Sequence, residues 1–358
     1  MAVLLLRVRV WSPKPLKLHF EFPRVVLMRT CGNKLAILKF IYLLVETADC
    51  GIVIVPSASS STSPPSSEKL ILPAFDFHSK SYALKVGLVG TKLPLYAFKR
   101  VNKIETEMDV HGHEVREPEP PIAFLDSLIL GEWKDHVRRG LFRYDITAHE
   151  TKVISGQYGF IAQLNYPRHL KKRPTEFRVE KFEASEDCEV QFHLSAPFDV
   201  ENSPRVVSIN VSPIKYGHVL LIPRVLECLL QRIDCVSFLL ALYTAAGAGN
   251  PHFRLGYNSL GAFATINHLH FQASYMALPF PIQKAPTRKI ITSGGCVKIS
   301  ELFNYPVRGL VFEGGNSLQD LSNTVSDACI CLQENNIPYN VLIVDCGKRI
   351  FLFPQRYA

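Results

Sequence analysis

The chain has 358 residues, 47% of them apolar, which suffices for one large core or two smaller ones and excludes a disordered body. Almost all of its net charge of +8 comes from residues 1–45, which contain eight Lys or Arg and a single acidic residue, Glu21. The remainder is nearly neutral, which argues against a general nucleic-acid-binding surface. No nucleic acid partner is therefore expected.

The nine cysteines are scattered and form no Cys-x-x-Cys pair, as is typical of reduced thiols in a cytosolic protein. The expected location is the cytoplasm, with the nucleus as a second one. The apolar stretch Leu35–Val55 is interrupted by Lys39, Glu46 and Asp49, each costly inside a bilayer, so no membrane span is expected. The basic, acid-poor start also suits an organelle transit peptide, which stays open as an alternative.

Composition divides the first hundred residues. Residues 1–56 form a basic arm that we leave unassigned, and residues 57–91 are expected to be a linker because Ser57–Ser67 is almost entirely Ser and Pro. Residues Pro121–Val137 then carry apolar side chains at helical spacing and predict a helix. Gly140–Asp145 is expected to turn into strands.

Two basic features follow. Arg143 alternates with apolar neighbours and is a candidate for contact with a sugar or a phosphate, although an exposed ion pair explains it as well. Arg168, Lys171 and Lys172 belong to a basic cluster at residues 168–173. That cluster is either a solvated loop or a clamp for a diphosphate, because guanidinium and ammonium groups both pair with phosphate oxygens.

The middle of the chain predicts strand, strand, helix, strand, strand. The order indicates an α+β fold, with a helix packed on an antiparallel sheet. The expected elements are strands at Val206–Val211 and His218–Ile222, a helix at Asp234–Ala248, and strands at His252–Gly256 and Ala262–Gln272.

The end of the chain repeats part of this order without the histidines. It predicts a strand at Val307–Phe312, a helix at Ser317–Asn335, and a hairpin of Asn340–Val344 with Arg349–Phe353. This repetition predicts a fold of two degenerate halves. We expect residues 92–290 to form the catalytic half and residues 291–358 a partial second half.

The chemically unusual stretch is residues 268–272. Successive side chains of a strand point to opposite faces, so His268, His270 and Gln272 would share one face while Leu269 and Phe271 enter the core. Two histidines at this spacing are also compatible with surface residues or hydrogen-bonded core residues. The stretch follows a segment rich in small residues that can bring backbone close to a ligand, which favours a functional interpretation.

These residues carry a family resemblance. Asn258, Thr265 and His268-x-His270-x-Gln272 resemble the nucleotide-phosphate site of the histidine-triad superfamily. Gln in the third place is similar to the branch containing galactose-1-phosphate uridylyltransferase. Longer runs resemble the plant GDP-L-galactose phosphorylase family: Gly140–Asp145, Arg168–Arg178, Tyr216–Arg224, Phe253–Gly261 and Lys298–Leu302.

The resemblance implies a histidine-triad-like antiparallel sheet and guanylyl transfer from a GDP-hexose to inorganic phosphate, a step of L-ascorbate biosynthesis. His270 would be the nucleophile, with a backbone carbonyl or polar group on its far ring nitrogen. His268 would position the loop, and Gln272 would bind an α-phosphate oxygen. No cofactor and no metal are implied. The implied substrate-binding residues are Asn258, Ser259, Thr265, Arg143, Arg168, Lys171 and Lys172.

Other functions stay open at this point. GDP-D-glucose is a second candidate substrate, water would replace phosphate in a histidine-triad hydrolase, and an inactive regulatory homologue is a third alternative. The partners implied are a GDP-hexose and phosphate, with a homodimer allowed by the uridylyltransferase analogy. The family continues beyond the position of Ala358, so the second half is expected to be truncated at its C-terminus.

Overall fold

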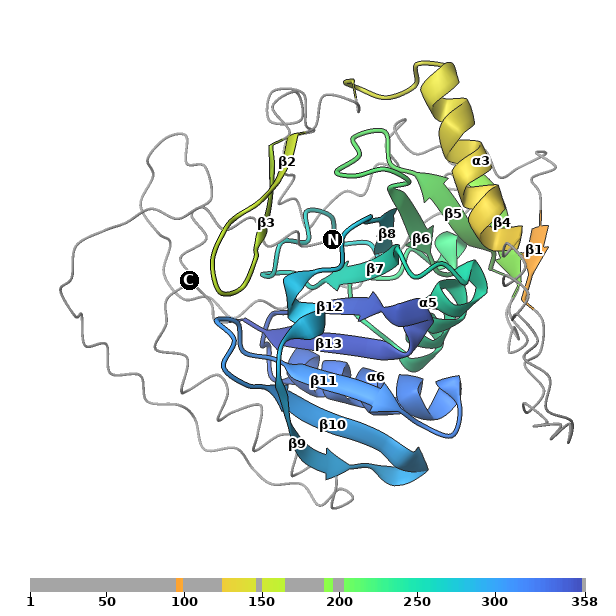
Figure 1. Cartoon of the computed structure of the whole chain (residues 1–358). Coiled ribbons are helices and arrows are strands. Elements are labelled where there is room, and N and C mark those ends of the chain that lie inside the picture. Colours follow the sequence, from red (N-terminus) through yellow and green to blue (C-terminus); the bar gives the residue numbers. More distant parts are fainter. Residues whose placement is uncertain (1–94, 99–123, 146–149, 165–189, 196–202, 356–358) are drawn as a thin grey trace, which may run out of the picture.

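The computed structural model of the chain describes residues 95–98, 124–145, 150–164, 190–195 and 203–355 (Figure 1). The predicted arm at 1–56, the linker at 57–91 and the basic cluster with Arg168, Lys171 and Lys172 lie outside these residues. The α+β class is confirmed, because the described residues form an eleven-stranded, mainly antiparallel sheet with three α-helices and a separate two-stranded hairpin.

The first half of the fold contains two of the helices. Its elements are β1 (Leu95–Ala97), α3 (Phe124–Arg138), β4 (Val190–Ser195), β5 (Arg205–Ile209), β6 (Val219–Ile222), α5 (Cys235–Ala248), β7 (Phe253–Asn258) and β8 (Phe271–Tyr275). Short 3-10 turns follow β6 at Val225–Glu227 and β8 at Pro281–Lys284. The helix predicted at 121–137 and the helix predicted at 234–248 are both confirmed.

The second half is built around α6 (Leu318–Glu334). Its strands are β9 (Thr287–Thr292), β10 (Val297–Leu302), β11 (Leu310–Gly314), β12 (Tyr339–Val344) and β13 (Arg349–Pro354), with 3-10 turns at Gly294–Cys296 and Asp345–Gly347. The helix and the final hairpin were predicted. The hairpin of β9 and β10 was missed, because its exposed, polar-rich first strand shows little apolar alternation.

The strand order repeats. Along the sheet the order is β5-β6-β8-β7-β12-β13-β11-β10, so each half places its first two strands outside and its post-helix hairpin toward the centre. β7 and β12 meet antiparallel at the junction, with Asn258 opposite Asn340. The two halves therefore have the same local topology and share one continuous sheet. The exact boundary between them stays a prediction.

The helices define two different faces of the sheet. In Figure 1, α5 and α6 lie behind the sheet, and the two helices pack against each other. The side chains directed at them form the main core, with Leu255, Tyr257, Phe271 and Ala273 among its members. A second, smaller core that includes Phe351 lies on the opposite face, which we call the front face.

Local sequence explains where α5 begins and ends. Asp234 accepts a hydrogen bond from the backbone N–H of Ser237 at 2.8 Å, which satisfies an otherwise unpaired amide of the first turn. Gly249 ends the helix at φ 59°, a left-handed conformation that favours glycine. The capping residues at the two ends and the apolar residues between them all lie within one short stretch of sequence. The helix was therefore predictable from the sequence.

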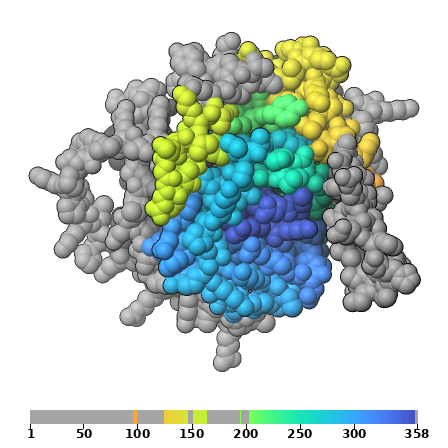
Figure 2. All heavy atoms as spheres, viewed as in Figure 1, coloured from red at the N-terminus to blue at the C-terminus, as the bar shows by residue number. Residues whose placement is uncertain are grey.

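A two-stranded hairpin stands over the front face. It consists of β2 (Glu150–Val153) and β3 (Ile161–Leu164). In the space-filling view its yellow-green atoms abut the cyan and blue atoms of the second half (Figure 2). Contacts between Tyr158, Phe160 and the Tyr305 ring join it to the loop between β10 and β11. The hairpin therefore encloses space over the sheet.

Two strand predictions are wrong. Residues 141–145 form bends and coil rather than strand, and the stretch predicted as a strand from Ala262 enters β8 only at Phe271. Gly261 and Phe263 both have positive φ, at 77° and 73°, which breaks the extended conformation. Residues 259–270 are instead a connection between β7 and β8. Within the described ranges, no helix has the length and apolar character to span a bilayer.

Candidate active site

The connection between β7 and β8 carries the candidate histidines. The matching connection of the second half, between β12 and β13, is only a short turn at Asp345–Gly347. Leu269 and Phe271 are fully buried in the main core, and Gln272 in β8 lies on the front face opposite Gly256 and Leu220. The expected alternation is therefore present at the end of the connection, although Gln272 is the only one of the three polar residues His268, His270 and Gln272 that lies in a strand.

His270 is held as a neutral base. Its Nδ1 lies 2.8 Å from the backbone carbonyl oxygen of His268. A carbonyl oxygen only accepts, so Nδ1 carries the proton and the lone pair is on Nε2. Burial lowers the pKa of His270 to about 4, with a smaller opposing effect from this hydrogen bond. The ring is therefore neutral near pH 7 and can attack an electrophile through Nε2.

His268 has a different place from the one predicted for it. It lies in a bend before β8 and only 4% of it is exposed, so it does not present its ring on a strand face beside Gln272. Burial, and then the neighbouring His270, lower its pKa to about 3. Its backbone carbonyl is the acceptor for His270. This contact uses only the backbone of residue 268, and the positioning role of the His268 side chain stays a prediction.

One glutamine holds the histidine connection in place. The Oε1 of Gln231 accepts from the backbone N–H of His270 at 3.0 Å. Its Nε2 donates to the carbonyl of Asn258 at 2.8 Å and to that of His270 at 3.3 Å. Gln231 is only 2% exposed, so these bonds form away from water. One amide therefore ties both ends of the β7–β8 connection together.

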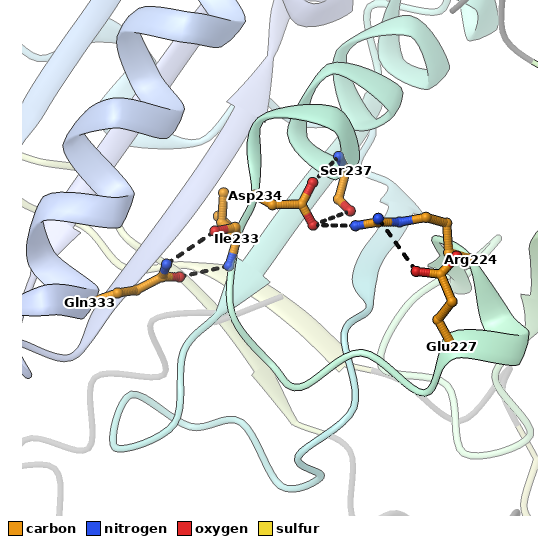
Figure 3. Close-up of polar contacts among 6 residues, drawn as sticks. All are labelled: Arg224, Glu227, Ile233, Asp234, Ser237 and Gln333. Atoms are coloured by element: carbon orange, nitrogen blue, oxygen red, sulfur yellow. Dashed lines mark hydrogen bonds and ion pairs between the residues drawn. The ribbon is translucent and has the colours of Figure 1, made fainter. Parts of the chain in front are cut away.

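The segment that carries Gln231 is fixed from two sides (Figure 3). Arg224 forms an ion pair with the capping residue Asp234 at 2.6 Å. On the other side, the α6 residue Gln333 accepts from the backbone N–H of Ile233 at 2.6 Å and donates to its carbonyl at 3.0 Å. The second half of the fold thus helps to position the segment that holds the His270 connection.

Asn258 is oriented by its counterpart in the second half. Its Oδ1 accepts from Nδ2 of Asn340 at 2.8 Å, and the same Nδ2 donates to the carbonyl of Ala262 at 2.8 Å. The amide Nδ2 of Asn258 has no partner among the described residues. It is a donor of fixed direction at the junction of the two halves, as a phosphate oxygen requires.

The remaining predicted residues of this connection differ in what they contact. The hydroxyl of Ser259 accepts from the N–H of Tyr339 at 2.8 Å and donates to the carbonyl of Leu260 at 3.1 Å. Its only proton is therefore donated to a backbone carbonyl, and the phosphate contact of Ser259 stays a prediction. Thr265 lies half-buried in the same connection, and its phosphate contact stays a prediction.

A lysine that was not predicted lies on the front face. Lys215 is in the turn before β6, a turn held by the hydrogen bond from the N–H of Ile214 to Nδ1 of His218 at 3.0 Å. Gly217 is required there, because its φ is 64° and a Cβ would lie 2.3 Å from the ring of Tyr275. The Nζ of Lys215 lies 3.4 Å from the hydroxyl of Thr151 in the hairpin. Burial lowers the pKa of Lys215.

A pocket lies between the hairpin and the front face. It encloses about 910 Å³, counting the part open to solvent. Lys215, Gly256 and Asn340 are among the residues that line it, together with several aromatic side chains. Gly256 is the strand neighbour of Gln272, and Asn340 is the partner of Asn258. The pocket therefore adjoins the candidate phosphate-binding residues.

The site mixes predicted and unpredicted residues. Arg143 is half-buried in the bend before the hairpin, where its backbone N–H donates to the carbonyl of Val211 at 3.0 Å. The contact of its side chain with the substrate stays a prediction. No pattern in the sequence marks Gln231 or Lys215 as site residues. Asn340 was also not predicted, although a polar residue in the otherwise apolar strand β12 is a signal that could have identified it. Among the described residues, no group of three or more His, Cys, Asp and Glu is placed to hold a metal ion.

Burial of the two rings predicts a pH-dependent stability. The folded protein keeps His268 and His270 neutral to about pH 3 and 4, whereas an unfolded chain takes up a proton at each near pH 6.5. The unfolded state therefore binds more protons as pH falls below 6.5, and the free energy of unfolding decreases. We expect the urea midpoint to fall between pH 7 and pH 5.

A pair of variants isolates this effect. His270→Asn removes one of the two buried titrating rings and should reduce the fall in the midpoint. His252→Asn changes an exposed histidine at the start of β7 and should leave the fall unchanged. A midpoint that stays constant from pH 7 to pH 5 in the unmodified protein would contradict neutral burial of the pair.

Two family models match this chain. The GDPGP1-like N-terminal domain matches residues 124–191 and 181–274, and the GDPGP1-like C-terminal domain matches residues 281–358. The chain belongs to the GDPGP1-like family. The gap between the two matches falls in the segment between β8 and β9, so the N-terminal model contains the candidate histidines and the C-terminal model contains Asn340.

Named relatives are enzymes that act on two different GDP-sugars. GDP-L-galactose phosphorylase 1 of Arabidopsis thaliana is 63% identical over 294 residues, covering 76% of this chain and 66% of the relative. GDP-D-glucose phosphorylase 1 of Bos taurus is 30% identical over 267 residues, covering 66% of this chain and 69% of the relative. The chain thus spans just under two thirds of its Arabidopsis relative.

The likeness to solved structures is weaker. The crystal structure of yeast Ap4A phosphorylase Apa2 aligns with a TM-score of 0.46 and 16% identity, covering 65% of this chain and 79% of the yeast one. The galt-like protein from Arabidopsis thaliana aligns with a TM-score of 0.35 and 14% identity, covering 47% of this chain and 79% of that one.

Proposed function

We propose that the chain catalyses phosphorolysis of a GDP-hexose, with GDP-L-galactose as the preferred substrate. The observation that carries the proposal is the imidazole of His270, whose Nδ1 is fixed by a carbonyl so that the neutral Nε2 is available as a nucleophile. Membership of a family whose named relatives are GDP-sugar phosphorylases supports the same reaction.

In the first step, Nε2 of His270 attacks the α-phosphorus of the GDP-hexose in line. The bond between the α-phosphorus and the bridging oxygen breaks, and hexose 1-phosphate leaves with that oxygen and its electron pair. A guanylyl group remains bonded to Nε2. The ring gains positive charge in this adduct, which the hydrogen bond from Nδ1–H to the carbonyl of His268 stabilises.

In the second step, an oxygen of inorganic phosphate attacks the same phosphorus from the vacated side. The bond between phosphorus and Nε2 breaks, its electron pair returns to the ring, and GDP departs. The donor Nδ2 of Asn258 and the amide of Gln272 would bind nonbridging α-phosphate oxygens in both steps. Lys215 would offset the negative charge of the phosphates. Ping-pong kinetics follow from the covalent intermediate.

Identity between sequences supports L-galactose as the sugar. The chain is 63% identical to the Arabidopsis GDP-L-galactose phosphorylase and 30% identical to the bovine GDP-D-glucose phosphorylase. The basic residues Arg168, Lys171 and Lys172 lie outside the described part of the chain, and their proposed contact with the diphosphate rests on the sequence alone.

Product analysis tests the proposal. The chain is incubated with GDP-L-galactose or GDP-D-glucose, with and without inorganic phosphate, and the nucleotides are separated by chromatography. We expect GDP as the product only when phosphate is present, and faster turnover of the L-galactose substrate. GMP released at the same rate without phosphate would instead identify a hydrolase, and no turnover of either sugar nucleotide would refute the enzymatic function.

A further inference from the structure

The pocket over the front face holds two hydrogen-bond acceptors whose direction is fixed. We propose that this pocket binds the purine base of the nucleotide and selects guanine through Oε1 of Gln163 and Oε1 of Gln355. The inference rests on the proposed function, because it concerns how the same site recognises its substrate.

The lining of the pocket suits a flat aromatic ring. Phe160 comes from the hairpin, Phe280 from the turn after β8, Tyr305 from the loop after β10 and Phe353 from β13. Phe160 and Tyr305 lie 6.2 Å apart with their planes at 65°. Nucleic-acid bases stack on such side chains at about 1–3 kcal/mol per base.

Gln163 supplies the first acceptor. The side chain is only 9% exposed and lines the pocket from β3. Its Nε2 donates to the carbonyl of Ile214 at 3.2 Å, and because a carbonyl only accepts, the orientation of the amide is fixed. The opposite atom, Oε1, is buried and has no hydrogen-bond partner among the described residues. A buried acceptor without a partner is costly, so a ligand that donates to it is favoured.

Gln355 supplies the second acceptor. Its Nε2 donates to Oδ1 of Asn340 at 3.1 Å. The orientation of Asn340 is itself fixed, because its Nδ2 donates to the carbonyl of Ala262. The amide of Gln355 therefore cannot be reversed without placing two oxygens together. Gln355 lines the same pocket, and the described residues provide no hydrogen-bond partner for its Oε1.

Two acceptors match guanine and oppose adenine. The Watson–Crick edge of guanine carries the donors N1–H and N2–H₂, whereas adenine has an acceptor at N1 and hydrogen on C2. Guanine would therefore give both glutamine oxygens a donor. Adenine has the donor N6–H₂ beside the acceptor N1, so it would give a donor to one glutamine oxygen at most and place the other against the lone pair of N1. The two acceptors would therefore favour guanine and also disfavour adenine.

The pocket adjoins the proposed phosphate site through neighbouring strands of the sheet. Gly256 separates Gln272 in β8 from Leu342 in β12, and both Gly256 and Leu342 line the pocket. With neighbouring strands about 4.8 Å apart, Leu342 lies about two strand spacings from Gln272. Asn340 links the two regions, because it holds Asn258 with its Nδ2 and Gln355 with its Oδ1. In the proposed binding mode, the α-phosphate lies at His270 and the base extends over Gly256 toward Leu342.

Equilibrium binding of GDP and ADP tests the inference. Dissociation constants for both nucleotides are measured by calorimetry with the full chain and with Gln163→Met, Gln355→Met and Gln319→Met. Methionine keeps the length of the side chain and removes its hydrogen-bonding groups. Gln319 is exposed on α6 and contacts the side chain of Asn323, so its variant is the matched control. The ratio of the two constants requires only folded protein, which thermal melting checks.

We expect the unmodified chain and Gln319→Met to prefer GDP, and each of the other two variants to lose about tenfold of that preference, as one mismatched buried hydrogen bond predicts. If both variants kept the wild-type preference for GDP over ADP, the inference about the base pocket would be wrong while the proposed function would be unaffected. Variants that change binding of a GDP-hexose relative to GDP, with the GDP to ADP ratio unchanged, would overturn it in favour of a sugar pocket. A wild-type chain that binds neither nucleotide and turns over no GDP-hexose would overturn the proposed function as well.

Discussion

Replacing His270 by asparagine is expected to lower the turnover of GDP-L-galactose by roughly 10³- to 10⁶-fold, because loss of the nucleophile removes the covalent path. Asparagine retains a polar group beside the carbonyl of His268 but has no nitrogen lone pair able to attack phosphorus. The protein should also fail to acquire an acid-labile label from GDP-hexose carrying a radioactive α-phosphate. Initial rates and retention of label on the denatured protein measure the two effects.

The matched control is His252→Asn, which makes the same chemical change at an exposed position outside the site. It should keep both full turnover and the label. His270→Asn protein with turnover near that of the unmodified chain would refute the assigned role. If the His270→Asn protein still acquired the acid-labile label, the nucleophile would be another residue.

Replacing Gln231 by methionine is expected to lower kcat by about 10²-fold, because misplacement of a reacting group by about 1 Å costs that much. Gln231 touches no substrate in our proposal. It acts through the backbone of His270 and Asn258, which it joins by three hydrogen bonds. Methionine fills a similar volume but leaves the N–H of His270 and two carbonyls without these partners. Each such group is worth about 1–3 kcal/mol of stability.

The readout must separate positioning from mere loss of fold. We expect kcat to fall more than KM changes, and the rate of label formation in a single turnover to fall with kcat, in protein that still melts cooperatively. Gln319→Met, on the exposed side of α6, should change neither quantity. If Gln231→Met folded and turned over like the unmodified chain, the histidine connection would be held by its other contacts and the positioning role would be wrong.

Much of the fold was predictable because its signals are local. The helix at 235–248 follows from an acidic N-cap, an apolar repeat and a terminal glycine within one stretch of chain. The repeated order of strand, helix and hairpin in the second half was likewise visible. Failures occurred where several local patterns fit equally, as at residues 262–270. There His-x-His alternation mimics a strand while positive φ values at Gly261 and Phe263 bend the chain away from the sheet.

Residue types and local spacing were enough to predict an imidazole at His270, an amide at Gln272, and apolar neighbours that anchor both. Which nitrogen of His270 is free, and that Gln231 and Asn340 hold the site, became apparent only in the folded arrangement. The physical reason is distance along the chain. Gln231 lies 39 residues from His270, and Asn340 lies 82 residues from Asn258, so no local pattern relates them. Their hydrogen bonds exist only because two halves of one sheet meet at β7 and β12.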